Sequence, residues 1–339
     1  MNGLELSKLY YETFGKPMLK EQFPHLLPYL AAGMCGAGSE CFGFDDEVSR
    51  DHDFEPGFRI FLPGEDVVDR REAFLLERAY AKLPKEFMGV KRPLMAPAGG
   101  ARHGVFRTAE FFAAKTGTPD GCLPAGGLTA AERSAAERSA ADGHAEIEED
   151  LTAWLRVPEQ SLAEATNGEI YFDDYGEVTK IRASLSYFPE DVRRKKLAGH
   201  LLLMAQSGQY NFRRCLLHGE SAAAQLAAGE FVRSGISVIF LLNRVYQPYY
   251  KWSFRALRAL PYLSMEAELF EYLLTTDNEG GTAEEKYDVI EGIAADVIDL
   301  LADEQLTKAV CGDLEKHAYS VNDSITDATL RNMHVLAAV

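Results

Sequence analysis

The chain has 339 residues, which is enough for about two domains of ordinary size. Hydrophobic residues make up 47% and aromatic residues 11% of it, so a substantial core can form and a largely disordered chain is excluded. The formal net charge of −17 repels a phosphate backbone and therefore disfavours broad, nonspecific binding of nucleic acid.

The N-terminal residues 1–11 predict an ordinary amphipathic helix. They lack the basic start and the apolar stretch of a secretion signal. The five cysteines are an odd number without a C-x-x-C pair, which argues against a disulfide framework and against a cysteine zinc site. No apolar run approaches the roughly 18 residues that a membrane span needs. We therefore expect a cytoplasmic protein that does not contact membranes.

The first 118 residues combine glycine turns with short β-like runs. Residues 28–32 lead into a glycine cluster, and residues 52–62 resemble a second strand. Residues 104–112 resemble a strand that runs into a helix. Residues 67–83 carry apolar side chains at helical spacing, and one helix face is predicted to hold Val67, Phe74, Leu75, Ala79 and Leu83.

Residues 119–150 form a compositionally simple segment. The direct repeat Ala-Glu-Arg-Ser-Ala occupies 131–135 and 136–140, and few nearby side chains can pack in a core. We interpret the segment as a flexible surface insertion within an N-terminal domain of residues 1–186.

From residue 187 onward the sequence is helical almost throughout, which predicts a helical bundle domain at 187–339. Proline and acidic residues at 189–191 are typical of a helix start. The basic run 193–196 predicts a solvated face, and the apolar stretch 235–242 predicts a buried helix. Further helices are expected at residues 221–246, 249–260, 265–274, 283–301 and 304–317.

Two carboxylates at alternate positions form the clearest candidate metal site. If residues 51–53 belong to a strand, Asp51 and Asp53 project from the same face while His52 points to the other. Carboxylate oxygens are the ligands that Mg²⁺ prefers. The pair therefore predicts a preformed site for Mg²⁺ or Mn²⁺, with His52 packed behind the strand.

A glycine-serine turn lies upstream of this pair, with eleven residues between Ser39 and Asp51. At the start of a helix, Gly38 lets the backbone approach a ligand closely, and the backbone N–H groups and the Ser39 hydroxyl offer donors to phosphate. The turn and the carboxylate pair together suit a nucleoside triphosphate, whose oxygens Mg²⁺ ions bridge.

This combination resembles the signature of the DNA polymerase β-like nucleotidyltransferase superfamily, which is Gly-Ser, a spacer of about this length, and Asp-x-Asp on a strand. The longer pattern is similar to the DUF4037 family of predicted nucleotidyltransferases, with recurring elements matched at residues 168–177, 187–191, 206–211 and 249–252. The resemblance implies an α+β fold, with an N-terminal polymerase β-like nucleotidyltransferase domain, a C-terminal helical bundle and an active site in the cleft between them.

Members of that superfamily usually place a third acidic residue on a later strand, where it completes the metal site or acts as a base. Two positions in this chain fit that description. Asp173 follows the β-like residues 170–172, and Glu110 follows residues 105–106. We favour Asp173 as the third catalytic carboxylate, with Glu110 as the alternative.

Four further residues are candidate nucleotide-binding residues. Lys251 and Arg255 are four apart on an expected helix and share one face. The resemblance implies that such cations approach the triphosphate, although an exposed basic face beside Trp252 is an equally good explanation. Tyr210 and Asn211 are expected to contact the nucleotide or the acceptor, and the alternative is that they cap helices.

These features together predict an enzyme that transfers a nucleoside monophosphate group from a nucleoside triphosphate to a hydroxyl acceptor. A small molecule, a protein or an RNA end would each suit the chemistry. The alternative is a non-catalytic nucleotide-binding or toxin–antitoxin-like regulatory protein that keeps the fold. A third reading is a helical interaction protein that binds no nucleotide.

Overall fold

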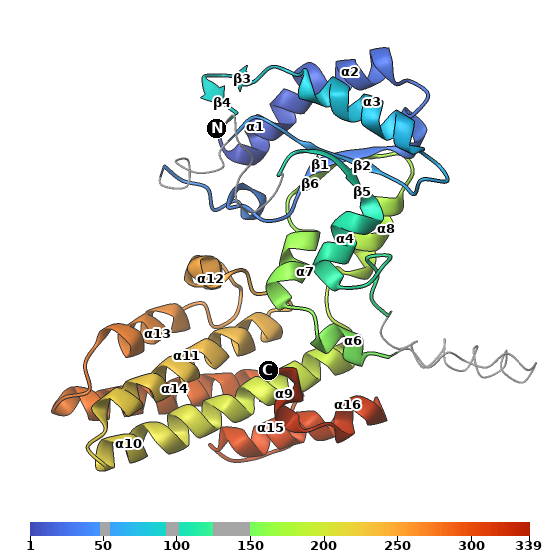
Figure 1. Cartoon of the computed structure of the whole chain (residues 1–339). Coiled ribbons are helices and arrows are strands. Elements are labelled where there is room, and N and C mark those ends of the chain that lie inside the picture. Colours follow the sequence, from blue (N-terminus) through green and yellow to red (C-terminus); the bar gives the residue numbers. More distant parts are fainter. Residues whose placement is uncertain (48–54, 93–101, 125–149) are drawn as a thin grey trace, which may run out of the picture. The chain divides into compact units, whose positions relative to one another are not determined.

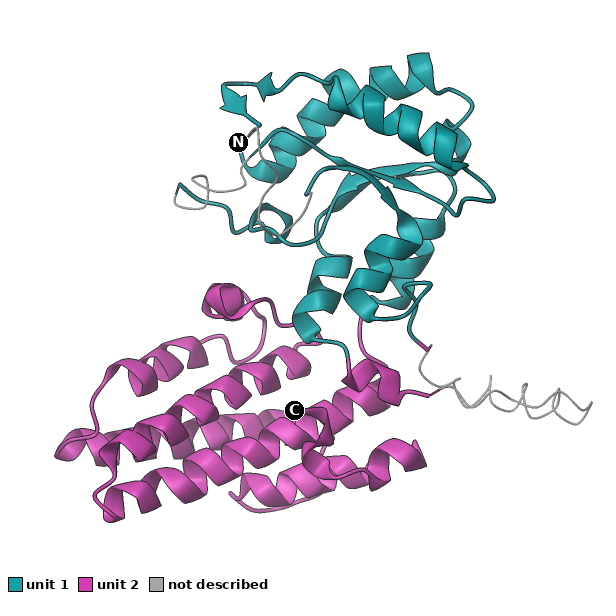
Figure 2. Ribbon diagram, viewed as in Figure 1, with its two compact units in different colours: residues 1–123, 157–186 teal, residues 124–156, 187–339 magenta. Residues whose placement is uncertain are grey.

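The chain forms two compact units in the computed structural model, which describes residues 1–47, 55–92, 102–124 and 150–339. The first unit comprises residues 1–123 and 157–186, and the second comprises 124–156 and 187–339 (Figure 2). Every described strand belongs to the first unit, and the second unit is helical. The protein therefore has a mixed α+β structure with a helical C-terminal region. Most of the predicted insertion, including the direct repeat, lies outside the described residues.

A four-stranded sheet with the order β5-β2-β1-β6 forms the centre of the first unit (Figure 1). Its strands are β1 (Ala31–Met34), β2 (Arg59–Leu62), β5 (Gly104–Arg107) and β6 (Glu169–Asp173). β1 is antiparallel to both of its neighbours, whereas β2 and β5 run parallel. Because Gly33 pairs with Arg59, the chain that leaves β1 and the chain that enters β2 lie at the same edge of the sheet. A separate hairpin pairs β3 (Glu86–Phe87) with β4 (Val90–Lys91).

Helices cover both faces of the sheet (Figure 1). Side chains alternate along β2, so Ile60 and Leu62 join the core on one face while Arg59 and Phe61 contact the first turn of α4 on the other. The strand and helix expected at residues 104–112 are confirmed as β5 and α4. The first face packs against α1 (Gly3–Tyr10), α2 (Lys16–Gln22) and α3 (Arg70–Ala81); α4 (Thr108–Thr116) packs with α7 (Glu159–Thr166) and α8 (Glu177–Ser184).

α3 buries a different face from the predicted one. Val67, Phe74 and Leu75 are 36%, 56% and 40% exposed, so the sequence-based assignment was wrong for these three residues, whereas Ala79 and Leu83 are buried as predicted. The rotation of the helix is set by Tyr80, whose hydroxyl donates to Phe58 O at 2.7 Å and accepts from Phe58 N at 3.0 Å. The buried residues of α3 are Leu76, Ala79 and Tyr80.

Long helices pack side by side in the second unit, with α9 between α11 and α15 (Figure 1). The helix start predicted at residues 189–191 is confirmed, because α9 begins at Glu190 directly after Pro189. The helices are α6 (Thr152–Leu155), α9 (Glu190–Met204), α10 (Arg213–Leu217), α11 (Ser221–Leu242), α12 (Tyr250–Leu257), α13 (Glu266–Thr275), α14 (Gly281–Asp303), α15 (Leu314–Asp323) and α16 (Ala328–Asn332), with the π-helix η5 (Ala205–Phe212) and the 3₁₀ segment η6 (Val335–Ala338).

The helix expected at residues 304–317 does not form. α14 extends to Asp303, and Gln305 then adopts a φ of +58°, which ends helical geometry. α15 starts only at Leu314, where the Asp313 side chain accepts a hydrogen bond from Glu315 N. The left-handed residue and the new cap together explain why the acidic, helix-favouring sequence after residue 303 is not helical.

α11 is the core helix of the second unit. By length and composition it is apolar enough to cross a membrane, but 67% of its most apolar window is buried inside the protein. The stretch 235–242, which the sequence predicts to be a buried helix, is buried throughout. Burial against neighbouring helices therefore accounts for its apolar composition.

The basic run 193–196 is not a solvated face, so this expectation was wrong. Arg193 and Lys195 are fully buried, and Lys196 is nearly so. Lys195 Nζ donates to Asn322 Oδ1 at 2.8 Å and to Met333 O at 2.6 Å. Arg193 donates to Glu190 and to Leu241 O, and Lys196 donates to Ala338 O. Polar groups inside the unit therefore satisfy these cations, whose burial without partners would be costly.

Candidate functional site

The Gly38–Ser39 turn follows β1 at the edge of the sheet. Gly36 and Gly38 have φ values of +111° and +146°, which favour glycine. Asn167, at the end of α7, fixes the turn because its Oδ1 accepts from Gly36 N at 2.8 Å and its Nδ2 donates to Gly36 O at 2.9 Å. Gly38 and Ser39 are half-buried, and the short 3₁₀ segment η3 (Glu40–Phe42) follows directly. The turn is thus held by two hydrogen bonds and remains partly open to solvent.

Two arginines lie against this turn. Arg102 Nη2 donates to Glu40 Oε1 at 2.6 Å and to Ala37 O at 2.8 Å. Arg59 Nε donates to Arg102 O at 2.8 Å, and its guanidinium lies over the Phe111 ring at 4.8 Å. Burial raises the pKa of Glu40, although the charge of Arg102 opposes this effect, and burial lowers the pKa of Arg59. The turn therefore has buried positive charge beside it.

His103 extends this group of charged side chains. Its side chain is only 5% exposed, and its Nε2 lies 3.4 Å from Glu55 Oε1. Neither ring nitrogen has a hydrogen-bond partner within the described part of the chain. Burial, followed by the charges of Arg59, Arg92 and Arg102, lowers the pKa of His103 well below its usual value. The ring is therefore neutral near pH 7.

The predicted metal ligands Asp51 and Asp53, together with His52, lie outside the described residues. The described chain resumes at Glu55 and then enters β2, at the same sheet edge as the Gly38–Ser39 turn. Within residues 1–47, 55–92, 102–124 and 150–339, no group of three or more His, Cys, Asp or Glu side chains could hold a metal ion. The Mg²⁺ site therefore stays a prediction.

Asp173 is the last residue of β6, and its carboxylate binds the backbone. Oδ1 accepts from Gly176 N at 2.8 Å, and Oδ2 accepts from Thr179 N at 2.6 Å. These hydrogen bonds satisfy N–H groups at the beginning of α8, which the helix itself leaves unpaired. Asp173 therefore acts as a helix cap. The alternative, Glu110, is exposed in the first turn of α4.

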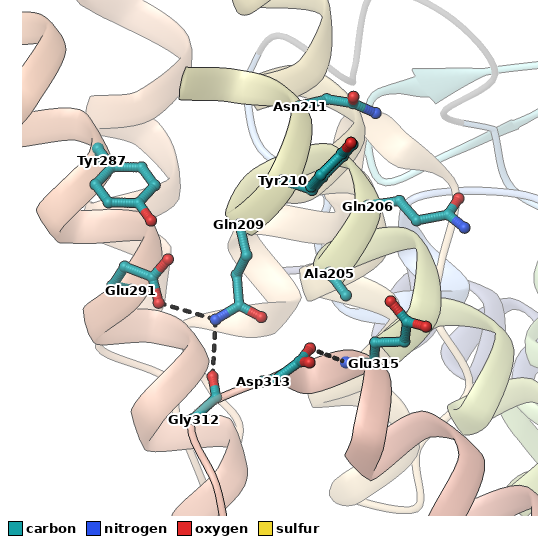
Figure 3. Close-up of a pocket in the computed structure, with 10 residues that line it drawn as sticks. All are labelled: Ala205, Gln206, Gln209, Tyr210, Asn211, Tyr287, Glu291, Gly312, Asp313 and Glu315. Carbon is teal, nitrogen blue, oxygen red and sulfur yellow. Dashed lines mark hydrogen bonds between the residues drawn. The ribbon is translucent and has the colours of Figure 1, made fainter. Parts of the chain in front are cut away.

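Tyr210 and Asn211 lie in η5, the π-helix that continues α9. π-helical turns are rare and occur often at functional sites. Both side chains are exposed, and the Arg214 guanidinium lies 4.9 Å from the centre of the Tyr210 ring. They line a pocket of about 570 Å³ within the second unit (Figure 3). Its other lining residues are Ala205, Gln206, Gln209, Tyr287, Glu291, Gly312, Asp313 and Glu315.

The pocket lining contains several acidic and amide side chains. Gln209 is fixed in it, because its Nε2 donates to Glu291 Oε2 at 2.8 Å and to Gly312 O at 2.9 Å (Figure 3). A hydrogen bond with Glu291, followed by burial, raises the pKa of Tyr287. Three carboxylates line the pocket, from Glu291, Asp313 and Glu315. This charge suits a neutral or cationic ligand better than a triphosphate.

Lys251 and Arg255 share the exposed side of α12, as expected from their spacing. Lys251 Nζ lies 5.0 Å from the centre of the Trp252 ring, a cation–π distance. Ser253 and Leu257 are the residues of α12 that are buried. The structure thus brings the two cations together in the second unit.

Four residues around the turn were not predicted from the sequence: Glu40, Arg59, Arg102 and Asn167. A lone arginine in the apolar run Phe58–Leu62 is the signal that could have identified Arg59, because an isolated charge in a buried strand needs a specific partner. Arg102 and Asn167 carry no such signal. They are 65 and 131 residues from the groups of the turn that they bind.

The fold defines a class of protein with two compact units, mixed α+β structure and a helical C-terminal region. Residues 154–253 match the family model described as a domain of unknown function, DUF4037. No curated protein and no solved structure matches the chain. The matched segment contains Asp173, Tyr210, Asn211 and Lys251, and it excludes the Gly38–Ser39 turn.

Proposed function

We propose that the protein is a Mg²⁺- or Mn²⁺-dependent nucleotidyltransferase that moves a nucleoside monophosphate group from a nucleoside triphosphate to a hydroxyl acceptor. The observation that supports this most is the Gly38–Ser39 turn. It is fixed by two hydrogen bonds with Asn167 and flanked by Arg59 and Arg102, at the sheet edge where the chain that follows Asp51 and Asp53 enters β2.

In the proposed reaction, the Gly38 backbone and the Ser39 hydroxyl donate hydrogen bonds to the terminal phosphates. The acceptor oxygen forms a bond to the α-phosphorus, the bond to the bridging oxygen breaks, pyrophosphate leaves, and the hydroxyl proton is released to solvent. The carboxylates of Asp51 and Asp53 have the donor chemistry to hold Mg²⁺, which would polarise the phosphate and acceptor oxygens.

We assign Tyr210 and Asn211 to the acceptor rather than to the nucleotide. The carboxylates of Glu291, Asp313 and Glu315 in the same pocket would repel a triphosphate, whereas they would attract amino or hydroxyl groups. A small hydroxylated or amine-bearing molecule therefore fits this pocket better than an RNA end.

One observation favours a second candidate, a regulatory protein that binds nucleotide without turnover. Asp173, the favoured third carboxylate, is bound to backbone N–H groups through both of its oxygens. If no other carboxylate completes the metal site, the protein would bind triphosphate and transfer nothing.

The deciding experiment incubates the protein with Mg²⁺, each α-labelled nucleoside triphosphate, and separated small-molecule, RNA and protein fractions of a bacterial lysate. We expect label in one fraction, and loss of that label in an Asp51→Asn/Asp53→Asn variant. The matched control is Asp299→Asn/Asp303→Asn, which removes the same charge from the exposed side of α14.

Retained transfer by the Asp51→Asn/Asp53→Asn variant would refute the proposed site. If triphosphate binds with Mg²⁺ but no fraction becomes labelled, the regulatory candidate is supported instead. Absence of both binding and transfer would leave the helical interaction protein.

A further inference from the structure

Arg102 lies directly over the glycine of the turn. A Cβ atom at Gly38 would overlap the Arg102 guanidinium and would lie 2.5 Å from Glu40 Oε1. Gly38 is therefore required by two features, its φ of +146° and the close approach of a charged side chain. The guanidinium thus occupies the space next to the backbone that we propose to bind phosphate.

Several charged side chains lie around the turn. Among the described residues, Arg59, Arg92 and Arg102 all act on His103, and the carboxylates are those of Glu40, Asp45 and Glu55. Arg102 is the cation that contacts the turn itself, through Ala37 O and the space above Gly38.

A second observation is a buried histidine beside these arginines. The His103 side chain is only 5% exposed, yet neither of its ring nitrogens is hydrogen-bonded within the described residues. Buried polar atoms are normally satisfied, and one that is not satisfied often has a role at a functional site. His103 belongs to the same charged group as Arg102 and Arg59.

We propose that Arg102 binds the terminal phosphates of the nucleoside triphosphate at the Gly38–Ser39 turn, and that Glu40 is its counter-ion when the nucleotide is absent. This inference rests on the proposed function. On binding, the guanidinium exchanges the Glu40 carboxylate for phosphate oxygens, which a planar guanidinium binds through two parallel hydrogen bonds.

The pair with Glu40 is suited to such an exchange. The two side chains are 13% and 11% exposed, so both charges are largely desolvated. Burial of ion pairs contributes little net stability, because the loss of hydration offsets their attraction. A phosphate group with two negative charges therefore competes well with one carboxylate, and the hydrogen bond from Arg102 to Ala37 O keeps the guanidinium at the turn.

The test measures binding of inorganic triphosphate, ATP and AMP to the full chain by isothermal titration calorimetry with Mg²⁺. We expect Arg102→Gln to weaken binding of triphosphate and ATP at least tenfold, and to change AMP binding less than twofold. Glu40→Gln should tighten triphosphate binding about threefold or more, because it removes the competing charge. Arg70→Gln, which breaks the exposed pair with Glu65, is the control and should change nothing.

Arg102→Lys keeps the charge without the two parallel donors and should fall between wild type and Arg102→Gln. Unchanged triphosphate affinity in Arg102→Gln, or an equal loss for triphosphate and AMP, would overturn the inference while the proposed function stands. If the wild type binds neither triphosphate nor ATP, the proposed function fails with it. Arg102-dependent triphosphate binding without label transfer would support the inference and count against catalysis.

Discussion

The sequence around Asp173 is compatible with two roles for its carboxylate, a catalytic acid and a helix cap. Its position after an apolar strand is typical of a catalytic acidic residue, and its contacts are those of a helix cap. A cap needs only backbone N–H groups near the helix start, here those of Gly176 and Thr179. The position alone therefore cannot distinguish a metal ligand from a cap, and only the contacts of both oxygens indicate the structural role.

We expect Asp173→Asn to retain nucleotide transfer within about tenfold of wild type, because a general base would lose about 10²- to 10⁴-fold. The substitution should lower the free energy of unfolding by about 1 kcal/mol, since an amide offers a single acceptor oxygen to Gly176 and Thr179. Label transfer and urea denaturation measure the two effects. Near-complete loss of transfer with unchanged stability would restore the catalytic role.

Glu266 of α13 is a buried carboxyl group that interacts with Asp296 of α14. Glu266 is only 5% exposed, and its Oε2 has no hydrogen-bond partner in the described part of the chain. Burial, with the nearby charge of Asp296 and a hydrogen bond to it, raises the pKa of Glu266 to about 7. The helix pair therefore holds a proton near neutral pH.

This proton makes the stability of the protein depend on pH. The folded state binds a proton that the unfolded state releases above its own pKa of 4.5, so the free energy of unfolding falls as the pH rises from about 4.5 to about 7. We expect Glu266→Gln to raise stability at pH 8 by on the order of 1 to 3 kcal/mol, and to have little effect at pH 4.5. Urea denaturation at several pH values measures this.

Glu268→Gln is the matched control, because Glu268 is exposed on the same helix. It should leave the pH dependence of unfolding unchanged. Equal effects of Glu266→Gln at pH 5 and pH 8 would show that the proton is not held at this position.

The charge of the whole molecule limits its partners. At a net charge of −17, a nucleic-acid backbone is repelled over most of the surface, and the positive groups at the turn are local. The basic run at residues 193–196 contains four cations. Three of them, Arg193, Lys195 and Lys196, are buried inside the second unit. The surface is therefore less basic than the sequence predicts.

We therefore expect the full chain to bind a single-stranded RNA of mixed sequence more weakly than about 100 µM at physiological salt, at the weak end of nonspecific affinities. Fluorescence anisotropy with a labelled oligonucleotide at 20 and 200 mM NaCl measures this. Micromolar binding that falls steeply with salt would contradict it and would favour an RNA acceptor.

Local sequence was sufficient for much of the fold. Capping signals predicted the start of α9, and apolar periodicity predicted α11, α12, α13 and α14 to within a few residues, because helix hydrogen bonds join groups four residues apart. The glycine turn was also predicted from local residues, since φ values of +111° and +146° favour glycine. The helix expected at 304–317 failed where Gln305 and the Asp313 cap changed the chain direction.

Only the tertiary structure decided which charges are buried and what they contact. Arg102 binds a residue of the turn that is 65 positions away in the sequence, and Asn167 binds one that is 131 positions away. Lys195 donates a hydrogen bond to Met333, 138 positions away. Such pairs form when separate elements pack, and their free energy depends on burial that no local pattern encodes. By itself the sequence therefore determined most of the helices and the glycine turn, and packing determined the arginines that surround the turn.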